Sequence, residues 1–363
     1  MNLKSRLQNL RHKLEEQELD GIFVSQPENR YYLSSFDGSA GFLLITPQNV
    51  VLATDFRYIE QARTQASDYE IFRITSTNFA AWLPQLAADL NLMRLGFEAG
   101  HVTFTMYQRL TEALKKGQSR LSLVPIDGLV ESLRAIKEPE EIELMTKASA
   151  ITDQAFNYIQ GEIHTGMSEQ AVAWEIERFL RENGSRSIPF DIIVASGSNS
   201  ALPHAKPSSR AIQSGEPVII DMGARVGGYS SDLSRTICLG TPDNTFTKVY
   251  DTVLGAQLTA MAVVKPGMTG EEADSLSRAV IEEAGYGEAF GHGLGHGVGL
   301  APHELPRLGP NSSEALVNGM VFTIEPGIYL TGWGGVRIED VVTIENGELR
   351  VITRAKKINN IGV

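Results

Sequence analysis

Hydrophobic and polar positions over the first 130 residues follow the pattern of an α/β unit. The chain begins with an amphipathic pattern in which four leucines fall on one helical face and charged residues on the other: Leu3, Leu7, Leu10 and Leu14. Three short apolar runs follow, at residues 21–24, 41–45 and 50–53, and we predict that they form strands. The turn signal at 46–49 separates the last two. We therefore expect an α/β domain over residues 1–130.

A charged stretch at residues 134–141 indicates the first helix of a second domain. Pro139 is tolerated in the first turn of a helix, and the acidic Glu140 and Glu141 suit the positive end of the helix dipole. Since a chain of 363 residues exceeds the usual size of one hydrophobic core, two domains are expected. We place the second over residues 131–363.

This second domain contains an internal repeat. Gly166-Met167-Ser168 corresponds to Gly267-Met268-Thr269, and Glu182-Asn183-Gly184 to Glu283-Ala284-Gly285; 267 − 166 and 285 − 184 both equal 101. In each copy the Ser or Thr is a natural N-cap, and the last glycine suits the end of the same helix. We predict a duplicated helix–helix–strand–strand unit whose two halves are related by a pseudo-twofold axis.

Each copy of the repeat supplies two acidic residues beside apolar strands. A glycine stands six residues before both Asp221 and Glu325, and each acid ends an apolar run. A second acid follows in each copy, Asp232 in the first and Glu339 in the second. The pseudo-twofold axis would bring these four carboxylates together.

A single acid at a strand end is commonly a turn residue or a salt-bridge partner. Four acids at equivalent places, each bounded by apolar residues, are harder to explain in that way. Buried carboxylates repel one another unless cations or protons compensate them. The four acids therefore predict a divalent metal site.

Histidines accompany the acids on glycine-rich or helix-free segments. His204 follows Pro203, and His292, His296 and His303 lie in the run 291–304. The glycines allow close approach of the backbone and leave the imidazoles directed into a cavity. The spacing of His292 and His296 is not a helix-borne zinc motif, because the spacers include glycines. Carboxylates with one imidazole suit Mn²⁺, with Co²⁺ and Zn²⁺ as alternatives.

Composition narrows the class of protein. The net charge of −12 argues against nucleic acid or an anionic membrane as the main partner. The single cysteine, Cys238, excludes an internal disulfide and lies in an apolar run that we expect to be a buried strand. We see no continuous apolar run of a signal peptide or of a membrane span, which needs about 20 residues. We expect a cytoplasmic protein.

At these residues the chain resembles the proline-specific branch of the pita-bread metallopeptidases, the prolidases and aminopeptidase P. Five segments carry the resemblance: Asp-Met-Gly at 221–223, Ser-Asp-Leu-Ser-Arg-Thr at 231–236, Gly-His-Gly-Val-Gly at 295–299, Thr-Ile-Glu-Pro-Gly at 323–327 and Val-Arg-Ile-Glu-Asp at 336–340. It covers nearly the whole chain, since residues 32–36 resemble a creatinase-like N-terminal domain. The implied fold is an α/β creatinase-like domain followed by an α+β pita-bread catalytic domain.

The resemblance implies a centre of two divalent ions. Asp221 would bind one ion through both oxygens, Asp232 and Glu339 would bridge the pair, and His296 and Glu325 would complete the second. A hydroxide bridging the ions would attack the peptide bond. Short proline-containing peptides are the implied substrates, and a homodimer is the implied assembly.

The resemblance also assigns roles around the metals. Glu325 would act as general base and then as general acid. His204, His292 and His303 would hold the substrate and stabilise the oxyanion. Arg337 lies two residues before Glu339, so on one strand the two would share a face, and we predict that Arg337 supports the metal ligands.

Three alternatives stay open on the sequence. Methionine aminopeptidases share the five ligand types and a segment like residues 303–306, but they usually lack so large an N-terminal domain. Creatinase-type enzymes have both domains but do without metals, and a non-catalytic binding protein would be expected to lose a ligand. Whether the enzyme is a dipeptidase or an aminopeptidase depends on what closes the pocket, which the sequence does not place.

Overall fold

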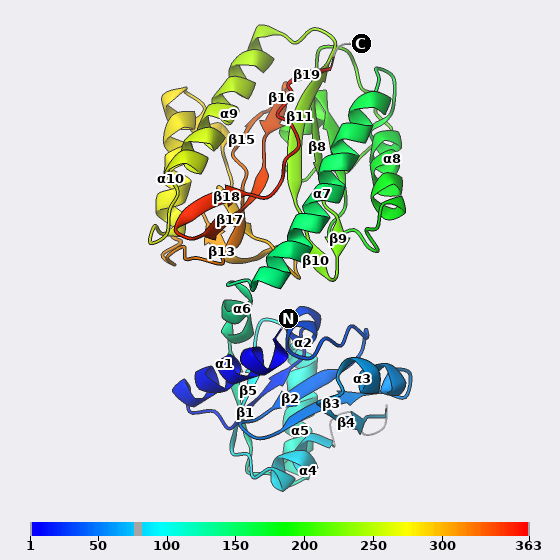
Figure 1. Ribbon diagram of the computed structural model, residues 1–363, viewed down its shortest axis with the longest axis vertical. Helices are drawn as coiled ribbons and strands as arrows, with labels where there is room; N and C mark the ends of the chain where they lie inside the picture. The colour runs from blue at the N-terminus through cyan, green and yellow to red at the C-terminus, as the bar shows by residue number, and fades with distance from the viewer. Residues whose placement is uncertain (1, 76–81, 362–363) are drawn as a thin grey trace. The chain divides into compact units, whose positions relative to one another are not determined.

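The computed structural model describes residues 2–75 and 82–361 (Figure 1). The chain divides into two compact units, Met1–Arg134 and Ala135–Val363. Within the described residues the first unit contains one sheet and the second contains several, and each unit has its own hydrophobic core.

A six-stranded mixed sheet forms the centre of the first unit, in the order β4-β3-β2-β1-β5-β6. Its strands are β1 (Gly21–Val24), β2 (Phe42–Ile45), β3 (Val50–Thr54), β4 (Glu70–Arg73), β5 (Arg94–Glu98) and β6 (Ser122–Ile126). The helices are α1 (Leu3–Glu16), α2 (Pro27–Ser34), α3 (Ile59–Gln65), α4 (Trp82–Asp89), α5 (Phe104–Lys116) and α6 (Leu129–Arg134). The predicted α/β character, the first helix and the first three strands are confirmed.

Hydrophobic burial explains this arrangement. Leu7, Leu10 and Leu14 of α1 are buried, as the amphipathic pattern predicts. All four residues of β1 are buried, because helices cover the sheet. Phe23 of β1 packs in one core with Trp82 of α4 and Leu110 of α5.

Four long helices of the second unit show the expected repeat. They are α7 (Pro139–Glu162), α8 (Glu169–Glu182), α9 (Asn244–Val263) and α10 (Gly270–Glu283), and α7 packs with α8 as α9 does with α10. Ser168 and Thr269 cap α8 and α10 through their side chains. Gly184 and Gly285 follow those helices with positive φ angles of 108° and 84°, which glycine adopts without strain. The predicted helix limits are confirmed.

Each copy of the repeat also forms a sheet. In the first copy the order is β19-β11-β8-β7, with β7 (Ile193–Ser196), β8 (Pro217–Met222), β11 (Leu233–Leu239) and β19 (Asn360–Ile361). In the second it is β13-β12-β14-β17-β18, with β12 (Gly295–Gly297), β13 (Glu304–Leu308), β14 (Val321–Ile324), β17 (Asp340–Glu345) and β18 (Glu348–Val351). Short 3₁₀ helices η1 (Gly197–Ala201) and η2 (Gly287–Ala289) precede the acid-bearing strands. Cys238 lies buried in β11, as predicted.

The predicted helix–helix–strand–strand unit omits one feature of both copies. A small antiparallel hairpin separates the two acid-bearing strands: β9 (Arg225–Val226) with β10 (Tyr229–Ser230) in the first copy, and β15 (Gly327–Leu330) with β16 (Gly334–Arg337) in the second. The second hairpin is longer, which explains why the spacing between the acids shifts from one copy to the other. Since β8 pairs antiparallel with β11 and β14 with β17, both acids of a copy lie at the same end of its strand pair.

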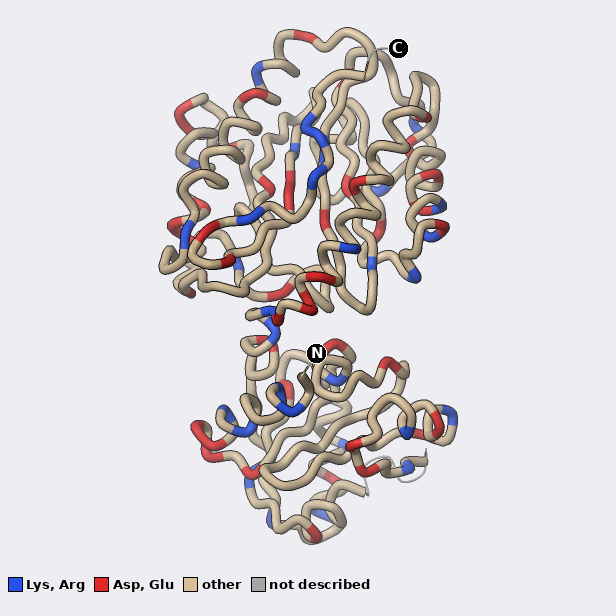
Figure 2. Tube along the Cα trace, viewed as in Figure 1, with Lys and Arg blue, Asp and Glu red and all other residues tan. Residues whose placement is uncertain are grey.

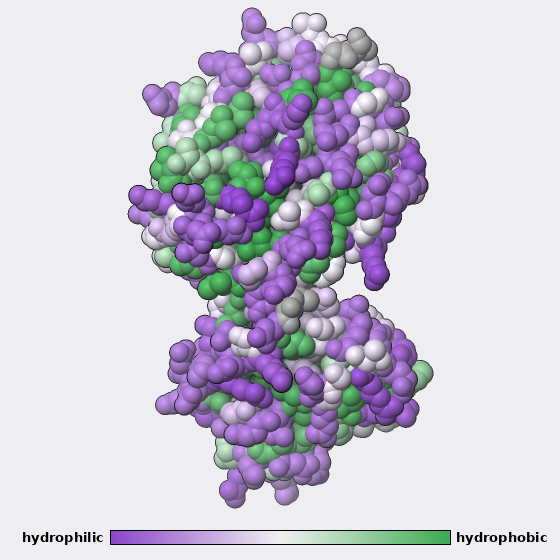
Figure 3. Space-filling view, in the orientation of Figure 1, coloured by the Kyte–Doolittle hydropathy of each residue, from purple (hydrophilic) through white to green (hydrophobic). Residues whose placement is uncertain are grey.

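Charged residues of both signs are interspersed over both units (Figure 2). The visible face of each unit is mostly hydrophilic, with scattered apolar patches (Figure 3). Among the helices of residues 2–75 and 82–361, none combines the length and the apolar character required to cross a membrane.

Candidate active site

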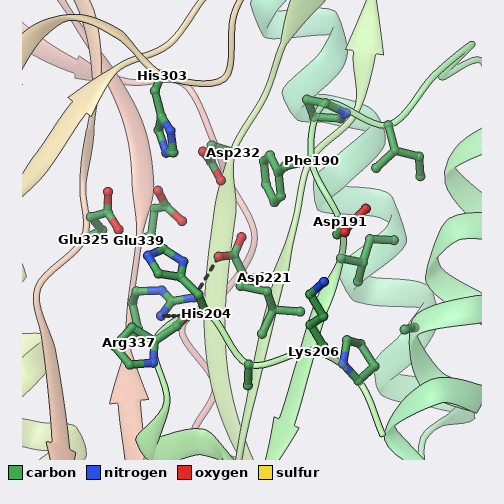
Figure 4. Close-up of a pocket in the computed structure, with 18 of the residues that line it drawn as sticks. Phe190, Asp191, His204, Lys206, Asp221, Asp232, His303, Glu325, Arg337 and Glu339 are labelled. Carbon is green, nitrogen blue, oxygen red and sulfur yellow. Dashed lines mark hydrogen bonds and ion pairs between the residues drawn. The ribbon is translucent and has the colours of Figure 1, made fainter.

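A cavity of about 1140 Å³ in the second unit collects the predicted site residues from both copies of the repeat. All nine of them line it: His204, Asp221, Asp232, His292, His296, His303, Glu325, Arg337 and Glu339. Phe190, Asp191 and Lys206 line the wall across from the carboxylates in the close-up view (Figure 4). The repeat therefore does bring the four acids into one place.

Three side chains form the tightest cluster of possible metal ligands. Asp232, His296 and Glu339 each offer a ligand atom, and these atoms lie within 4.8 Å of one another. Asp232 directly precedes β11, Glu339 directly precedes β17, and His296 lies in the middle of β12. Both carboxylates are nearly inaccessible, with 5% and 2% of their residue surface exposed.

Glycines hold His296 in this position. A Cβ atom at Gly295 would lie 2.1 Å from the carbonyl oxygen of Thr323 in β14, and one at Gly297 would lie 2.1 Å from that of Leu305 in β13. Strand β12 therefore fits between its neighbours only with glycine on both sides of the histidine. This is the close backbone approach that the glycine-rich run predicts.

Asp221, in β8, is one of the two carboxylates that the first copy of the repeat contributes to the site. Its Oδ2 accepts a hydrogen bond of 2.7 Å from Nη2 of Arg337. Its Oδ1 is buried and has no hydrogen-bond partner among the residues that the structure describes. A buried carboxylate oxygen without a donor, facing a group of other carboxylates, fits a cation as its missing partner.

The prediction that Arg337 and Glu339 lie on the same face of one strand is wrong. We predicted that the two lie on one strand and share a face, but β16 ends at Arg337 and β17 begins at Asp340. The chain leaves one strand pair for another at Ile338 and Glu339, so the strand alternation does not apply there. The carboxylate that Arg337 binds is that of Asp221.

Arg337 is held from several directions. Nε donates to Ser234 Oγ at 2.9 Å, and Nη1 donates to Tyr329 Oη at 2.9 Å and to the Pro203 carbonyl at 3.2 Å. Tyr329 Oη in turn lies 3.0 Å from His292 Nε2. A hydrogen-bonded chain thus runs from His292 through Tyr329 and Arg337 to Asp221. Sequence reasoning missed Tyr329, because it occupies an ordinary strand position and no motif distinguishes it.

Glu325 and His296 form an ion pair. Glu325 Oε1 lies 3.2 Å from His296 Nε2 and accepts a hydrogen bond of 3.0 Å from Thr323 Oγ1. Burial alone would raise the pKa of Glu325, but the hydrogen bond and charge of His296 outweigh it and lower the pKa to about 2. Burial alone would lower the pKa of His296, but the Glu325 hydrogen bond and charge, with Asp232, raise it to about 9.

The pKa is raised, rather than lowered as for Glu325, at the other three carboxylates: Asp221, Asp232 and Glu339. Burial raises the pKa of each, and the charges of neighbouring carboxylates raise it further, most strongly for Asp232 and Glu339. These groups resist being charged together unless cations accompany them. Four carboxylates and one imidazole are hard and borderline ligands of the kind that divalent ions prefer. The residues present therefore fit a divalent metal centre.

The other three histidines surround this centre. The ring of His303 meets that of His296 edge to face, with the centroids 4.0 Å apart. In the close-up view His303 and His204 lie on opposite sides of the carboxylates (Figure 4). Burial lowers the pKa of His292 and of His303, and the charge of His296 lowers that of His303 further. Both are therefore neutral near pH 7 and can donate or accept a hydrogen bond.

Comparison with known proteins identifies the family. Residues 143–346 match the model of metallopeptidase family M24, and residues 6–136 match the creatinase/prolidase N-terminal domain. The chain belongs to metallopeptidase family M24. The match of the M24 model spans all four acids, His204 and the histidine-rich run.

Relatives within M24 match over nearly their full length. The Xaa-Pro dipeptidase of Pyrococcus furiosus is 37% identical, with 98% of this chain and 100% of the relative covered. A solved structure of an Xaa-Pro dipeptidase from Bacillus anthracis is 41% identical, covers 100% of both chains and has a TM-score of 0.95. The X-Pro aminopeptidase of Thermotoga maritima is 34% identical, covers 96% of this chain and 100% of its own, and has a TM-score of 0.86. The expected creatinase-like domain followed by a pita-bread catalytic domain is confirmed.

Proposed function

We propose that this M24 metallopeptidase hydrolyses the peptide bond that precedes proline, in Xaa-Pro dipeptides or at the N-terminus of longer peptides. The observation that carries the proposal is the convergence of four carboxylates and His296 in one cavity of about 1140 Å³. The names of the relatives, Xaa-Pro dipeptidase and X-Pro aminopeptidase, support the proline specificity.

Five side chains would hold two divalent ions. Asp221 would hold one, His296 and Glu325 the other, and Asp232 and Glu339 would be shared. The orphaned Oδ1 of Asp221 and the raised pKa of Asp232 support these assignments. Divalent ions bound there supply a water of lowered pKa and polarise the scissile carbonyl. We propose Mn²⁺ as the native ion, with Co²⁺ or Zn²⁺ as alternatives, because carboxylates dominate the ligand set.

Glu325 would move the proton during hydrolysis. In the metal-free protein burial would raise the pKa of Glu325, but the hydrogen bond and charge of His296 outweigh burial and lower it to about 2, so the carboxylate is ionised. In the loaded enzyme His296 is neutral, and the Glu325 carboxylate would accept the proton of the attacking water as general base. The same group would then deliver that proton to the departing proline nitrogen, as general acid. A tertiary amide nitrogen is a poor leaving group without it.

Two histidines would hold the substrate. His303 and His204 line the cavity on two sides of the carboxylates, where they can bind the substrate and donate to the developing oxyanion (Figure 4). Proline has no amide hydrogen and a fixed φ, so a site that accepts it must bind the ring rather than a backbone N–H. Arg337 would hold Asp221 in place without touching the substrate. The homodimer and the cytoplasmic location stay predictions.

Hydrolysis of three peptides by metal-stripped enzyme refilled with Mn²⁺, Co²⁺ or Zn²⁺ tests the proposal. We expect cleavage of Ala-Pro, of Ala-Pro-Ala, or of both, and none of Met-Ala-Ala. Cleavage of Ala-Pro alone identifies a dipeptidase, and release of alanine from Ala-Pro-Ala identifies an aminopeptidase. Cleavage of Met-Ala-Ala alone, or no cleavage with any ion, would overturn the proposal.

A further inference from the structure

Glu169 is a fully buried acid in the first turn of α8, and it is not among the residues that line the cavity. Its carboxylate accepts hydrogen bonds from three residues. Oε1 accepts from Ser196 N at 2.7 Å, from Ser196 Oγ at 2.8 Å and from Asn199 Nδ2 at 3.1 Å. Oε2 accepts from Ser208 N at 3.0 Å, from Ser208 Oγ at 2.6 Å and from Asn199 Nδ2 at 3.1 Å.

The donors stand at the two ends of one segment. Ser196 ends β7 and Ser208 follows Pro207, so the carboxylate joins both ends of residues 197–207. His204 lies in this segment and lines the cavity. Glu169 therefore holds the base of a loop whose far part faces the metal centre.

Arg337 holds the same loop at its middle. Its Nη1 donates to the Pro203 carbonyl, directly before His204, at 3.2 Å. The loop is thus fixed at its base by a carboxylate and beside His204 by a guanidinium. Fixing the ends and one inner point restricts the positions that the His204 ring can take.

The second copy of the repeat has no acid at the position equivalent to Glu169. Gly270 stands where Glu169 stands in the first copy, since 270 − 169 equals the repeat spacing of 101. A Cβ atom at Gly270 would lie 2.0 Å from the Arg307 carbonyl oxygen, so α10 packs directly on the backbone of β13. The repeated fold therefore does not require a carboxylate at this position. In the first copy the Glu169 carboxylate binds both ends of segment 197–207.

Only an ionised carboxylate satisfies this set of donors. Burial alone would raise the pKa of Glu169, but the hydrogen bonds of Ser208 and Ser196 lower it below its usual value. An amide in its place would direct its own N–H groups at the N–H groups of the loop and leave buried donors unpaired. Hydrogen bonds to a charged carboxylate are the stronger kind, and losing them removes the side chain that joins the two ends of the loop.

We infer that Glu169 is a positioning residue for hydrolysis: it fixes both ends of segment 197–207 and thereby places His204 against the substrate. The inference rests on the proposed function, in which His204 contacts the substrate. It assigns Glu169 no contact with substrate or metal.

A double-mutant cycle on hydrolysis of Ala-Pro or Ala-Pro-Ala tests the inference. Glu169→Gln should lower kcat/KM by roughly 10–100-fold, the range seen when supporting residues are lost. In the His204→Ala background the same substitution should cost less than about twofold, because two residues that act through one group do not have additive effects. Full additivity of the two losses would overturn the inference.

Two further variants separate positioning from general destabilisation. Asn199→Ala removes one donor and keeps the carboxylate, so it should show a smaller loss with the same non-additivity. Glu182→Gln, on the same helix, alters an exposed acid with a single 3.4 Å contact to Arg178 and should leave kcat/KM unchanged. Bound metal should be equal in all of them.

A readout independent of activity distinguishes failure of the inference from failure of the proposed function. In the zinc-loaded protein, the NMR signal of the His204 ring is assigned by its loss in His204→Ala, among seven histidines. Glu169→Gln should shift or broaden this signal, and Glu182→Gln should not. An unchanged His204 signal in Glu169→Gln would overturn the inference even if Xaa-Pro peptides are cleaved. If none is cleaved, the proposed function fails and the NMR signal alone decides whether Glu169 places His204.

Discussion

Arg337 Nη2 donates a 2.7 Å hydrogen bond to Asp221 Oδ2, so a cation from the second copy of the repeat compensates a carboxylate from the first. The two side chains are nearly buried, with 4% and 14% of their surface exposed. A buried carboxylate needs a partner of opposite charge. In the metal-free protein the Arg337 guanidinium compensates the charge of Asp221. In the loaded enzyme a metal ion would compensate part of this charge as well.

Arg337→Met should therefore destabilise the metal-free protein more than the loaded one. Removing one partner of a buried ion pair typically costs about 3–5 kcal/mol, because the other charge stays buried. Metal bound to Asp221 would offset part of this cost, so the gap in Tm between the loaded and metal-free forms should widen. Calorimetry of both forms measures it.

A matched control for this variant is Arg350→Met. Arg350 pairs with Glu345 at 2.8 Å, but 39% and 35% of the two side chains are exposed. Exposed pairs contribute at most about 1 kcal/mol, so the Tm of both forms should shift little. If Arg337→Met loses the same stability in the loaded and metal-free forms, bound metal does not compensate the charge of Asp221 in place of Arg337.

Asp232→Asn should reduce hydrolysis to background and reduce bound metal to one ion or none per chain. The amide keeps the shape of Asp232 but loses the anionic oxygen that we place between two ions. Metal analysis of the purified variant and its rate with Ala-Pro or Ala-Pro-Ala check this result. Asp251→Asn, at an exposed position of α9, is the control. Full activity in Asp232→Asn would refute the bridging role.

The internal repeat made most of this site predictable from sequence. Equal spacing placed Asp221 and Glu325 at corresponding strand ends, and twofold symmetry then required the four acids to meet. Apolar residues around each acid indicated burial, and buried carboxylates indicated cations. None of these steps needed the path of the chain between the strands.

What escaped prediction depends on contacts between segments far apart in the chain. Tyr329 lies in β15, and it contacts His292, 37 residues away in the chain, and Arg337 of the paired strand β16. Arg337 was placed by strand alternation, which fails where the chain leaves β16 for β17. Glu169 directly follows the predicted N-cap Ser168, and its donors lie 27 to 39 residues further along the chain, so no local pattern indicates its role.

His303→Ala should lower turnover while leaving bound metal nearly unchanged. The His303 ring packs against that of His296 at a centroid distance of 4.0 Å but lies outside the tight cluster of Asp232, His296 and Glu339. Losing a hydrogen-bond donor to a developing oxyanion costs about 10²–10³-fold in kcat. Steady-state kinetics with metal analysis separates the two effects. A metal-free His303→Ala protein would show that His303 is itself a ligand.

Metal binding at pH 7 should release protons, and this release should decrease as the pH rises through 9. The pKa of His296 is raised to about 9 in the metal-free protein, because the hydrogen bond and charge of Glu325 outweigh burial, so the ring is protonated at pH 7. A metal ligand must be the neutral imidazole, which requires loss of that proton. Above pH 9 the ring is already neutral and has no proton to release. Glu325, with its pKa lowered to about 2 by His296 against the effect of burial, contributes none at either pH.

Titration calorimetry of Mn²⁺ into the metal-free protein, in buffers of different ionisation enthalpy, counts the released protons. The count at pH 7 should exceed that at pH 10, and His296 should account for about one proton per chain of this difference. His164→Ala, at an exposed histidine outside the cavity, should keep this difference, and His296→Ala should reduce it by about one proton per chain. A proton count independent of pH between 7 and 10 would mean that His296 is neutral before metal binds, and the ion pair with Glu325 would then not exist in solution.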